Sequence, residues 1–227
     1  LGMRVDPVDP TEIRVVHLLR HGEVRNPEGV LYGRLPGYHL SARGRQMAEI
    51  VAGQLASVPL SLVATSPLER AVETAEPILA AHPEAEYRVD DRLIEADSRF
   101  AGQPVGRRRL AILTPANWRY LVNPLRPSWG EPWRELAARM TAAIYDAAVA
   151  VGPGGQALLV SHQSPIWTAR LALEGRPLSH LPTTRRCRLA SITSVHLLGT
   201  RVLRIDYSEP AAELYGRDAN APISSGA

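Results

Sequence analysis

Several kinds of residue are scarce or missing in this 227-residue chain. Lysine is absent, so all 26 basic residues are arginine. The single cysteine, Cys187, has no partner within the chain, which excludes a scaffold of intrachain disulfides. No run of 18 or more apolar residues occurs, so the sequence predicts no membrane-spanning helix. No basic start precedes an apolar stretch, and we therefore expect no signal peptide and a cytoplasmic location.

The charge balance is basic, but the arrangement of the charges does not indicate a nucleic-acid partner. The formal net charge is +3, although the pI is about 9.3. Arginine stays charged at any working pH and its planar guanidinium matches phosphate and carboxylate. The arginines alternate with acidic residues and form no basic stripe, so we expect no nucleic-acid partner. The only uninterrupted run of three is Arg107-Arg108-Arg109, which we interpret as a solvated surface, with contact to a second anionic group of a substrate as the alternative.

The length and composition are those of one sizeable globular domain spanning 1–227. Hydrophobic residues make up 45% of the chain and charged residues 22%, both ordinary values for such a domain. Strand and helix patterns alternate without an internal repeat, which predicts a three-layer α/β/α sandwich around a mostly parallel sheet. Its core covers about 13–207 and a tail covers 212–227. The segment 102–130, rich in Pro, Arg and Trp, is expected to be either a lid-like excursion or a surface insertion.

Hydrophobic periodicity places the individual elements. The predicted strands are 13–19, 60–65, 87–93 and 157–161, and a hairpin joins 194–198 to 201–207. Helices are predicted after Ser41, over 66–81, over 131–151 and from Ser164 to Gly175, with a further one near 109–121. The segment Ser66-Pro67-Leu68-Glu69 predicts a helix start in which the Ser66 hydroxyl accepts a backbone hydrogen bond. His180 falls in a predicted loop and belongs to no motif.

Ionisable residues gather where the predicted strands end. The residues at these strand ends are Arg20, His21, Ser66, Arg70, Glu95, His162 and Gln163. In an open parallel sheet the carboxyl ends of the strands share one edge, and ligands bind there. Each residue alone is weak evidence. Two arginines, two histidines and a glutamate at one edge are hard to explain by packing, so the sequence predicts a functional site.

This set of residues suits phosphoryl transfer. Two guanidiniums and the helix N-termini would bind a dianion, while Gly22 lets the backbone approach it. The same positive charge lowers the pKa of His21, which favours a neutral, nucleophilic imidazole. His162, protonated once substrate is bound, would stabilise charge on the transferred group. Glu95 would protonate the leaving oxygen and later deprotonate water. This chemistry needs no metal, and no Cys cluster offers a metal site.

Four segments also resemble one known family. Arg20-His21-Gly22 resembles the Arg-His-Gly motif of the histidine phosphatase superfamily, also called phosphoglycerate mutase-like, and Asn26 lies where that family often has Asn. Residues 40–48 are similar to its Leu-Thr/Ser-x-x-Gly-x-x-Gln-Ala segment, and residues 66–75 to its Ser-Pro-Leu-x-Arg-Ala-x-Glu-Thr-Ala segment. Residues 159–162 are similar to the strand that delivers the second histidine. The resemblance covers roughly 13–207.

The resemblance implies a three-layer α/β fold and a covalent phosphohistidine on His21. It further implies that Arg20, Arg70 and His162 form the phosphate pocket and that Glu95 is the proton donor, with Asp97 as a rival. The positions at which the family contacts substrate are Tyr32, Gly33 and Arg34.

Three departures from the family pattern refine the expected activity. Gln163 replaces a common glycine, with an amide that could contact phosphate, and Glu131-Pro132 replaces a Glu-Ser pair. The segment 95–102 is not the Glu-Arg-His-Tyr-Gly run of cofactor-dependent mutases. We therefore predict a metal-independent phosphatase, without a cofactor, that hydrolyses a small phosphorylated metabolite through a phosphohistidine. The alternatives are a cofactor-dependent phosphoglycerate mutase and a non-catalytic module that binds a phosphorylated ligand. Neither the individual substrate nor the oligomeric state follows from the sequence.

Overall fold

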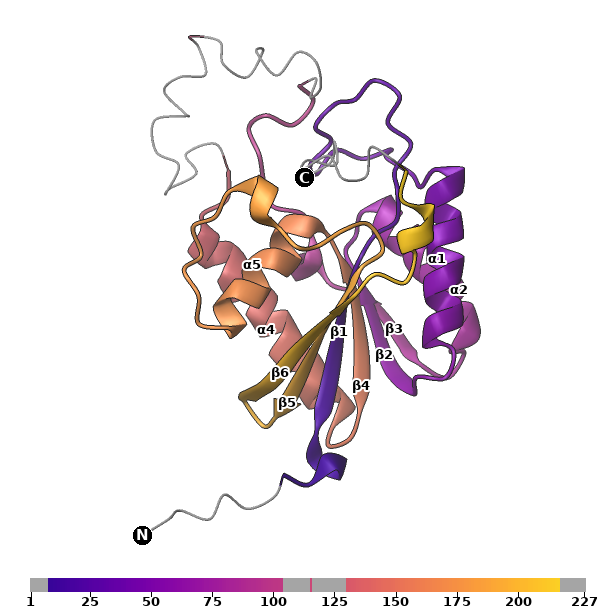
Figure 1. Cartoon of the computed structure of the whole chain (residues 1–227), viewed down its shortest axis with the longest axis vertical. Coiled ribbons are helices and arrows are strands. Elements are labelled where there is room, and N and C mark those ends of the chain that lie inside the picture. Colours follow the sequence, from indigo (N-terminus) through magenta and orange to yellow (C-terminus); the bar gives the residue numbers. More distant parts are fainter. Residues whose placement is uncertain (1–7, 104–114, 116–129, 217–227) are drawn as a thin grey trace.

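A computed structural model describes residues 8–103, 115 and 130–216 of the chain. Its centre is a six-stranded sheet with the strand order β3-β2-β4-β1-β5-β6 (Figure 1). The strands are β1 (Arg14–Arg20), β2 (Leu60–Thr65), β3 (Glu86–Val89), β4 (Gln156–Ser161), β5 (Ile192–Leu198) and β6 (Arg201–Ser208). Strands β1 to β4 are parallel, β5 pairs antiparallel with β1, and β6 pairs antiparallel with β5. The predicted mostly parallel sheet and its terminal hairpin are confirmed.

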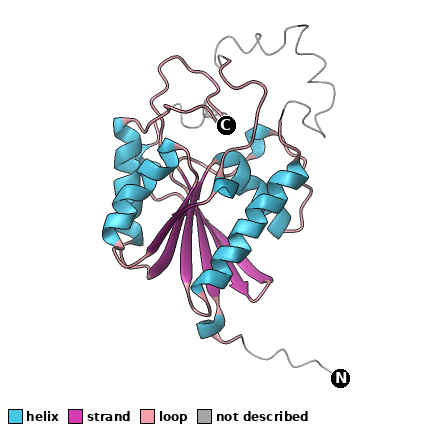
Figure 2. Ribbon diagram, turned by 180° about the vertical axis from the view of Figure 1, so that it is seen from behind, coloured by secondary structure: helices cyan, strands magenta, loops and turns pink. Residues whose placement is uncertain are grey.

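Helices cover both faces of this sheet, as Figure 2 shows from behind. The helices are α1 (Ala42–Leu55), α2 (Glu69–Ala81), α4 (Trp133–Val151) and α5 (Gln163–Leu173). Along β1 the apolar side chains alternate between the two faces: Val16 and Leu18 pack with α4 and α5, whereas Leu19 packs with α1 and α2. A central strand that is buried on both sides needs such a continuous apolar run. The predicted three-layer sandwich is therefore confirmed.

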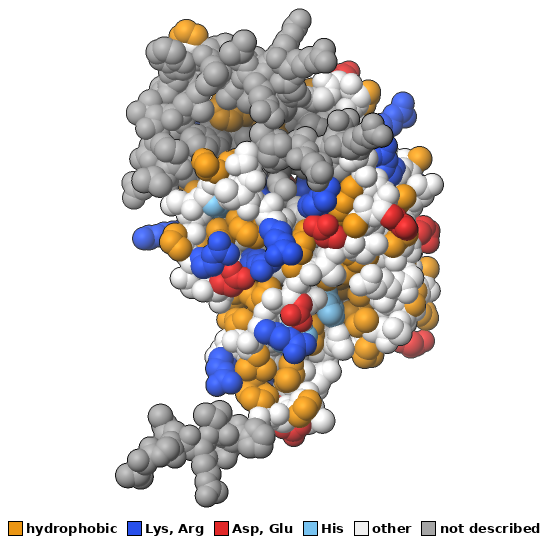
Figure 3. Space-filling view, viewed as in Figure 1, with side chains coloured by type: hydrophobic (Ala, Val, Ile, Leu, Met, Phe, Trp, Pro, Cys, Tyr) orange, Lys and Arg blue, Asp and Glu red, His pale blue; other side chains and the backbone are white. Residues whose placement is uncertain are grey.

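Charged side chains of both signs are interspersed on the described part of the face drawn in Figure 3. Within the described residues, no helix is long and apolar enough to cross a membrane.

The structure differs from the sequence predictions at two places, the start of α2 and the end of β3. Helix α2 begins at Glu69, and its N-cap, Leu68, makes no side-chain capping bond. The Ser66 hydroxyl accepts the predicted backbone hydrogen bond, from the Leu68 amide at 3.3 Å, and is also bonded to a histidine ring, described below. Strand β3 ends at Val89 rather than at residue 93, because the Asp90 carboxylate accepts a hydrogen bond from the Arg92 amide and starts a short 3-10 helix.

The predicted C-terminal tail is packed over the part of it that the structure describes. Ala212–Leu214 form a 3-10 helix, and the Tyr215 hydroxyl donates to the Leu189 carbonyl at 2.6 Å. Leu214 and Tyr215 also pack against the apolar cluster under α1 and α2. The rest of the tail lies outside the described residues. So do residues 104–129 of the expected excursion, except Pro115; these include Arg107-Arg108-Arg109 and the helix predicted near 109–121.

The register of the strands places their carboxyl ends at one edge. Arg20, the last residue of β1, pairs with Ser161, the last residue of β4. Thr65, the last residue of β2, pairs with Val160 of β4. The residues that follow these three strands therefore meet at the same edge of the sheet.

Candidate active site

Two buried histidines face each other at the carboxyl edge of the sheet. His21 follows β1, His162 follows β4, and their ring centroids are 5.1 Å apart at an interplanar angle of 59°. Both side chains are 0% exposed, and Glu95 beside them is only 2% exposed. Arg20 and Arg70 are likewise buried. The strand-end residues predicted to converge do lie together.

His21 is held with one ring nitrogen available. Its Nδ1 lies 2.8 Å from the carbonyl oxygen of Gly22. A carbonyl only accepts, so Nδ1 carries the proton and Nε2 presents a lone pair. Nε2 is buried and has no hydrogen-bond partner in the protein. Burial, followed by the charges of Arg70 and Arg20, holds the pKa of His21 well below its ordinary value, so the imidazole is neutral.

His162 presents its other nitrogen to the same space. Its Nε2 lies 2.7 Å from the Ser66 hydroxyl, which in turn accepts a hydrogen bond from the Leu68 amide at 3.3 Å. The Ser66 proton is thus directed to Nε2, and Nδ1 carries the imidazole proton without a protein partner. Burial, with the charges of Arg70, His21 and Arg20, keeps the pKa of His162 well below its usual range in the free protein.

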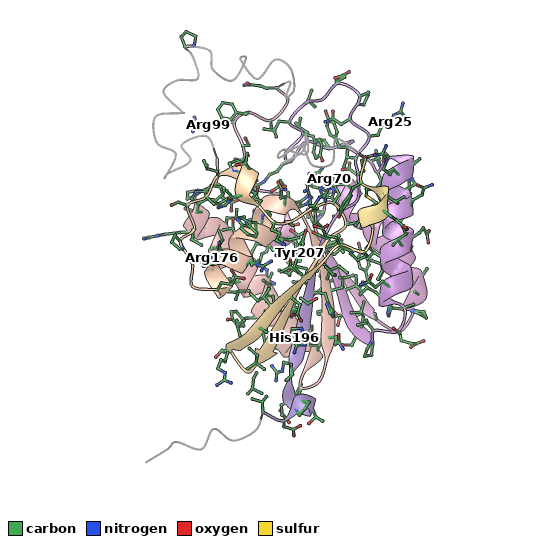
Figure 4. The ribbon with its side chains drawn as sticks, in the orientation of Figure 1. Arg25, Arg70, Arg99, Arg176, His196 and Tyr207 are labelled. Atoms are coloured by element: carbon green, nitrogen blue, oxygen red, sulfur yellow. The ribbon has the colours of Figure 1, made fainter. Side chains whose placement is uncertain are left out.

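Arg70 supplies buried guanidinium donors from the first turn of α2. One Nη donates to the carbonyl of Gly33, and the guanidinium carbon lies 4.7 Å from the centre of the Tyr32 ring. Tyr32 is itself buried and stacks on Tyr38. The Nε and the other Nη of Arg70 have no hydrogen-bond partner. Figure 4 shows Arg70 above the carboxyl ends of the strands, whereas His196 lies lower, on β5.

Arg20 and Gln163 are fixed by a shared acceptor. An Nη of Arg20 donates to the Cys187 carbonyl at 2.8 Å, and the Gln163 amide donates to the same oxygen at 3.2 Å. Helix α5 begins at Gln163, immediately after His162, so its N-terminal dipole is directed at the histidine pair. The loop before β5 therefore ties the first strand to the start of α5.

Glu95 is a buried carboxyl group with one free oxygen. Its Oε1 accepts a hydrogen bond from the Ala96 amide at 2.8 Å, and Oε2 has no partner. Burial raises the pKa of Glu95, although the Ala96 bond and the nearby charges of Arg185 and other arginines oppose this. Asp97, the rival for the acid role, is exposed. The buried environment that favours the protonated form of a carboxyl group belongs to Glu95.

A network of charged groups holds the backbone at Glu95. The Arg34 Nε donates to the Glu95 carbonyl at 2.7 Å, and an Nη of Arg139 lies 3.4 Å from the same oxygen. Both guanidiniums also bind the Glu131 carboxylate, at 3.0 and 2.7 Å. Arg34, one of the predicted substrate contacts, is thus bonded to the Glu95 carbonyl and to the Glu131 carboxylate.

Two other predicted substrate contacts shape loops in the structure. The Asn26 side chain donates to the Val30 carbonyl and accepts from the Val30 amide, which closes the loop between them. A Cβ on Gly22 would lie 2.6 Å from the Gly44 carbonyl oxygen, so glycine is required there for close packing against α1. The Gly22 amide donates to Thr74 at 3.1 Å.

Two arginines near Glu95 belong to none of the sequence motifs. Arg139 lies in the middle of α4, whose periodicity marks only its apolar face. Arg185 follows the 3-10 helix Pro182–Thr184 and interacts electrostatically with Glu95 and Arg20. The signal that could have revealed Arg185 is the second arginine-rich stretch, Arg185-Arg186-Cys187-Arg188. In the ranges 8–103 and 130–216, no group of three or more His, Cys, Asp or Glu could hold a metal ion.

Known proteins are similar to this chain in sequence and in fold. The chain is 50% identical over 197 residues to the uncharacterised protein Rv0525 of Mycobacterium tuberculosis, covering 87% of this chain and 96% of that protein. It is 31% identical over 201 residues to a probable phosphoglycerate mutase, GpmB, of Yersinia enterocolitica, covering 86% of this chain and 85% of the relative. The solved mycobacterial glucosyl-3-phosphoglycerate phosphatase Rv2419c superposes with a TM-score of 0.68 at 25% identity, covering 86% of this chain and 97% of that one.

The sequence profile of one family matches most of the chain. The match runs over residues 16–205 and contains both histidines of the pair. Of the six strands it leaves out only the first two residues of β1 and the last three of β6. The chain therefore belongs to the histidine phosphatase superfamily, branch 1.

Proposed function

We propose that this protein is a phosphatase that hydrolyses a small phosphomonoester through a phosphohistidine on His21 and needs no metal ion. The observation that carries the proposal is the unprotonated, unpartnered Nε2 of buried His21, which lies beside the free donors of Arg70 and His162. The arginines supply the positive charge that a phosphoryl dianion requires. The expected substrate is a small phosphorylated metabolite.

In the first step, His21 Nε2 attacks phosphorus and the bond from phosphorus to the leaving oxygen breaks. Glu95 donates its proton to that oxygen, so an alcohol departs and a carboxylate remains. The Nδ1 proton of His162 and the Nη and Nε protons of Arg70 are available to the three equatorial oxygens. A bound dianion would also raise the pKa of His162 and favour its protonated form, because opposite charges attract.

In the second step, water attacks the phosphohistidine. The Glu95 carboxylate takes the proton from this water, the N–P bond breaks, and His21 returns to its neutral state. Inorganic phosphate then leaves, and Glu95 is again protonated. One carboxyl group thus serves as acid and then as base, which its raised pKa supports.

A phosphoglycerate mutase is the second candidate, because one relative at 31% identity carries that name. Against it stands the segment after Glu95, which lacks the Arg-His-Tyr-Gly continuation of the cofactor-dependent mutases. An assay of transfer between 3- and 2-phosphoglycerate, with the bisphosphate primer present, distinguishes the two. Phosphate release without transfer supports the phosphatase.

The decisive experiment is rapid-quench labelling with radiolabelled para-nitrophenyl phosphate in the presence of EDTA. We expect acid-labile label on the wild-type protein, no label on His21→Ala, and normal label on His39→Ala, which alters an exposed histidine. Hydrolysis without label would remove the covalent mechanism. Tight binding of phosphoesters without phosphate release would identify a non-catalytic binding module.

A further inference from the structure

Arg185 is fixed beside the active site by groups that leave part of its guanidinium unused. One Nη donates to the Ser164 hydroxyl at 2.7 Å, and Nε donates to Nε2 of His180 at 2.9 Å. The guanidinium carbon lies 5.9 Å from the centre of the Trp133 ring. These neighbours fix the orientation of the guanidinium plane. The second Nη takes part in neither of the two hydrogen bonds.

The groups that hold Arg185 are neutral. His180 donates its Nδ1 proton to the Leu178 carbonyl at 2.8 Å, so Nε2 is an acceptor. Burial lowers the pKa of His180 to about 4, and the ring therefore stays neutral at working pH. The same ring packs on Trp133 at a centroid distance of 4.5 Å. Arg185 is thus preorganised without being neutralised.

No carboxylate among the described residues forms an ion pair with Arg185, whereas nine other described arginines each pair with a carboxylate. Burial lowers the pKa of Arg185 to about 10, which reports the cost of holding this charge away from water. The acidic group that most affects Arg185 is Glu95, whose own burial favours the uncharged form. A partly buried cation of this kind is suited to an anion that arrives from outside the protein.

The position of Arg185 indicates which part of a substrate it would meet. Ser164, its acceptor, lies two residues after His162, and Cys187, two residues after Arg185, holds Arg20 and Gln163 through its carbonyl. Arg185 is also close enough to Glu95 for their charges to interact. Because Glu95 is the proposed donor to the leaving oxygen, Arg185 lies on the side of the leaving group.

We infer that Arg185 is a specificity-determining residue that binds a carboxylate carried by the leaving group of the substrate. This inference rests on the proposed phosphatase function. A guanidinium held in one plane, with hydrogen-bond donors still available, matches a planar carboxylate better than the compact charge of an ammonium group does. The preferred substrates are therefore phosphomonoesters of hydroxy acids.

The test uses pairs of substrates that differ at the carboxylate. One pair is 3-carboxyphenyl phosphate and 3-carbamoylphenyl phosphate, and a smaller pair is phosphoglycolate and 2-hydroxyethyl phosphate. kcat/KM is measured for the wild type, Arg185→Met, Arg185→Lys and the control Arg186→Met. Arg186 is exposed, and its guanidinium lies over the Tyr207 ring, so this control removes a neighbouring charge of the same kind.

We expect the wild type and Arg186→Met to prefer the carboxylate in at least one pair by about 10- to 100-fold, the range of a hydrogen bond to a charged group. Arg185→Met should abolish the preference while retaining turnover of the neutral member, and Arg185→Lys should restore part of it. The inference is overturned if the wild type shows no preference in either pair. It is also overturned if Arg185→Met slows both members equally, which would indicate a structural role or an effect through Glu95.

Failure of the phosphatase proposal gives a different result, namely no hydrolysis of any of the four esters. In that case calorimetry with 3-phosphonobenzoate and phenylphosphonate, which cannot be hydrolysed, decides the role of Arg185. Tighter binding of the carboxylate compound that is lost in Arg185→Met supports the inference, and equal binding overturns it.

Discussion

Replacing Glu95 by glutamine separates its chemical role from its structural one. Glutamine has nearly the same shape, and its carbonyl oxygen can keep the bond from the Ala96 amide that Oε1 now accepts at 2.8 Å. The backbone carbonyl of residue 95 is held by Arg34 and Arg139 and is untouched by the change. The substitution therefore removes one dissociable proton from a site that remains in place.

The expected loss depends on how much the leaving oxygen needs that proton. General acid catalysis contributes about 10²- to 10⁴-fold, or about 3–5 kcal/mol in the barrier. An alkyl phosphate, whose alkoxide is a poor leaving group, should lose this whole factor in kcat/KM. Para-nitrophenyl phosphate releases nitrophenolate, which is a stable anion, so its kcat/KM should fall only a few-fold. Its steady-state kcat should still fall, because water attack on the phosphohistidine also uses the Glu95 carboxylate.

The assay compares kcat/KM for the two esters and follows nitrophenolate release in the first turnover. Glu95→Gln should show a burst followed by a slow phase, as a phosphoenzyme accumulates. Asp97→Asn is the matched control, since Asp97 is exposed and should leave both esters nearly unchanged. Equal losses on both esters in Glu95→Gln would refute the acid role, and a leaving-group-dependent loss in Asp97→Asn would transfer it to Asp97.

Two further predictions concern stability. A Cβ on Gly44 would overlap a backbone carbonyl of the loop before α1, whereas a Cβ on Gly53 in the same helix meets nothing within 4 Å. In urea unfolding, Gly44→Ala should therefore destabilise the protein by about 1–3 kcal/mol, and Gly53→Ala should stabilise it by about 0.5–1 kcal/mol. Equal effects of the two substitutions would contradict the packing argument. The lowered pKa values of His21 and His162 mean that the unfolded chain binds more protons below about pH 6.5, so the free energy of unfolding should fall as the pH drops below that value. Because Glu95, with its raised pKa, acts in the opposite direction, the measurement is made in the Glu95→Gln background, and a flat pH profile there would count against buried neutral imidazoles.

The residues that follow the central strands could be predicted from the sequence because the fold leaves them little freedom. A buried parallel strand needs a continuous apolar run, so Leu18 and Leu159 mark β1 and β4. Parallel pairing then aligns the strand ends, and the register of Arg20 with Ser161 follows. His21 and His162 are each one residue beyond this pair, which is why their proximity was predictable.

The roles of polar groups within loops were less predictable. Ser66 has the sequence pattern of a helix cap, and its oxygen does accept a hydrogen bond from the Leu68 amide, but the pattern does not reveal that its proton is donated to His162. Arg34 matches a substrate-contact position, yet the Glu131 carboxylate and the Glu95 carbonyl are both within hydrogen-bond distance of it. Such choices among several partners depend on the course of loops, which neither periodicity nor spacing specifies.

The loop before β5 joins the two halves of the proposed site in different ways. On the phosphate side it uses the backbone carbonyl of Cys187, which any residue at that position would provide to Arg20 and Gln163. On the leaving-group side it uses a side chain, that of Arg185. A substitution at 185 can therefore change which leaving groups bind while the acceptor for Arg20 stays in place. This separation is the physical reason to expect that Arg185→Met alters selectivity more than it alters the chemistry at His21.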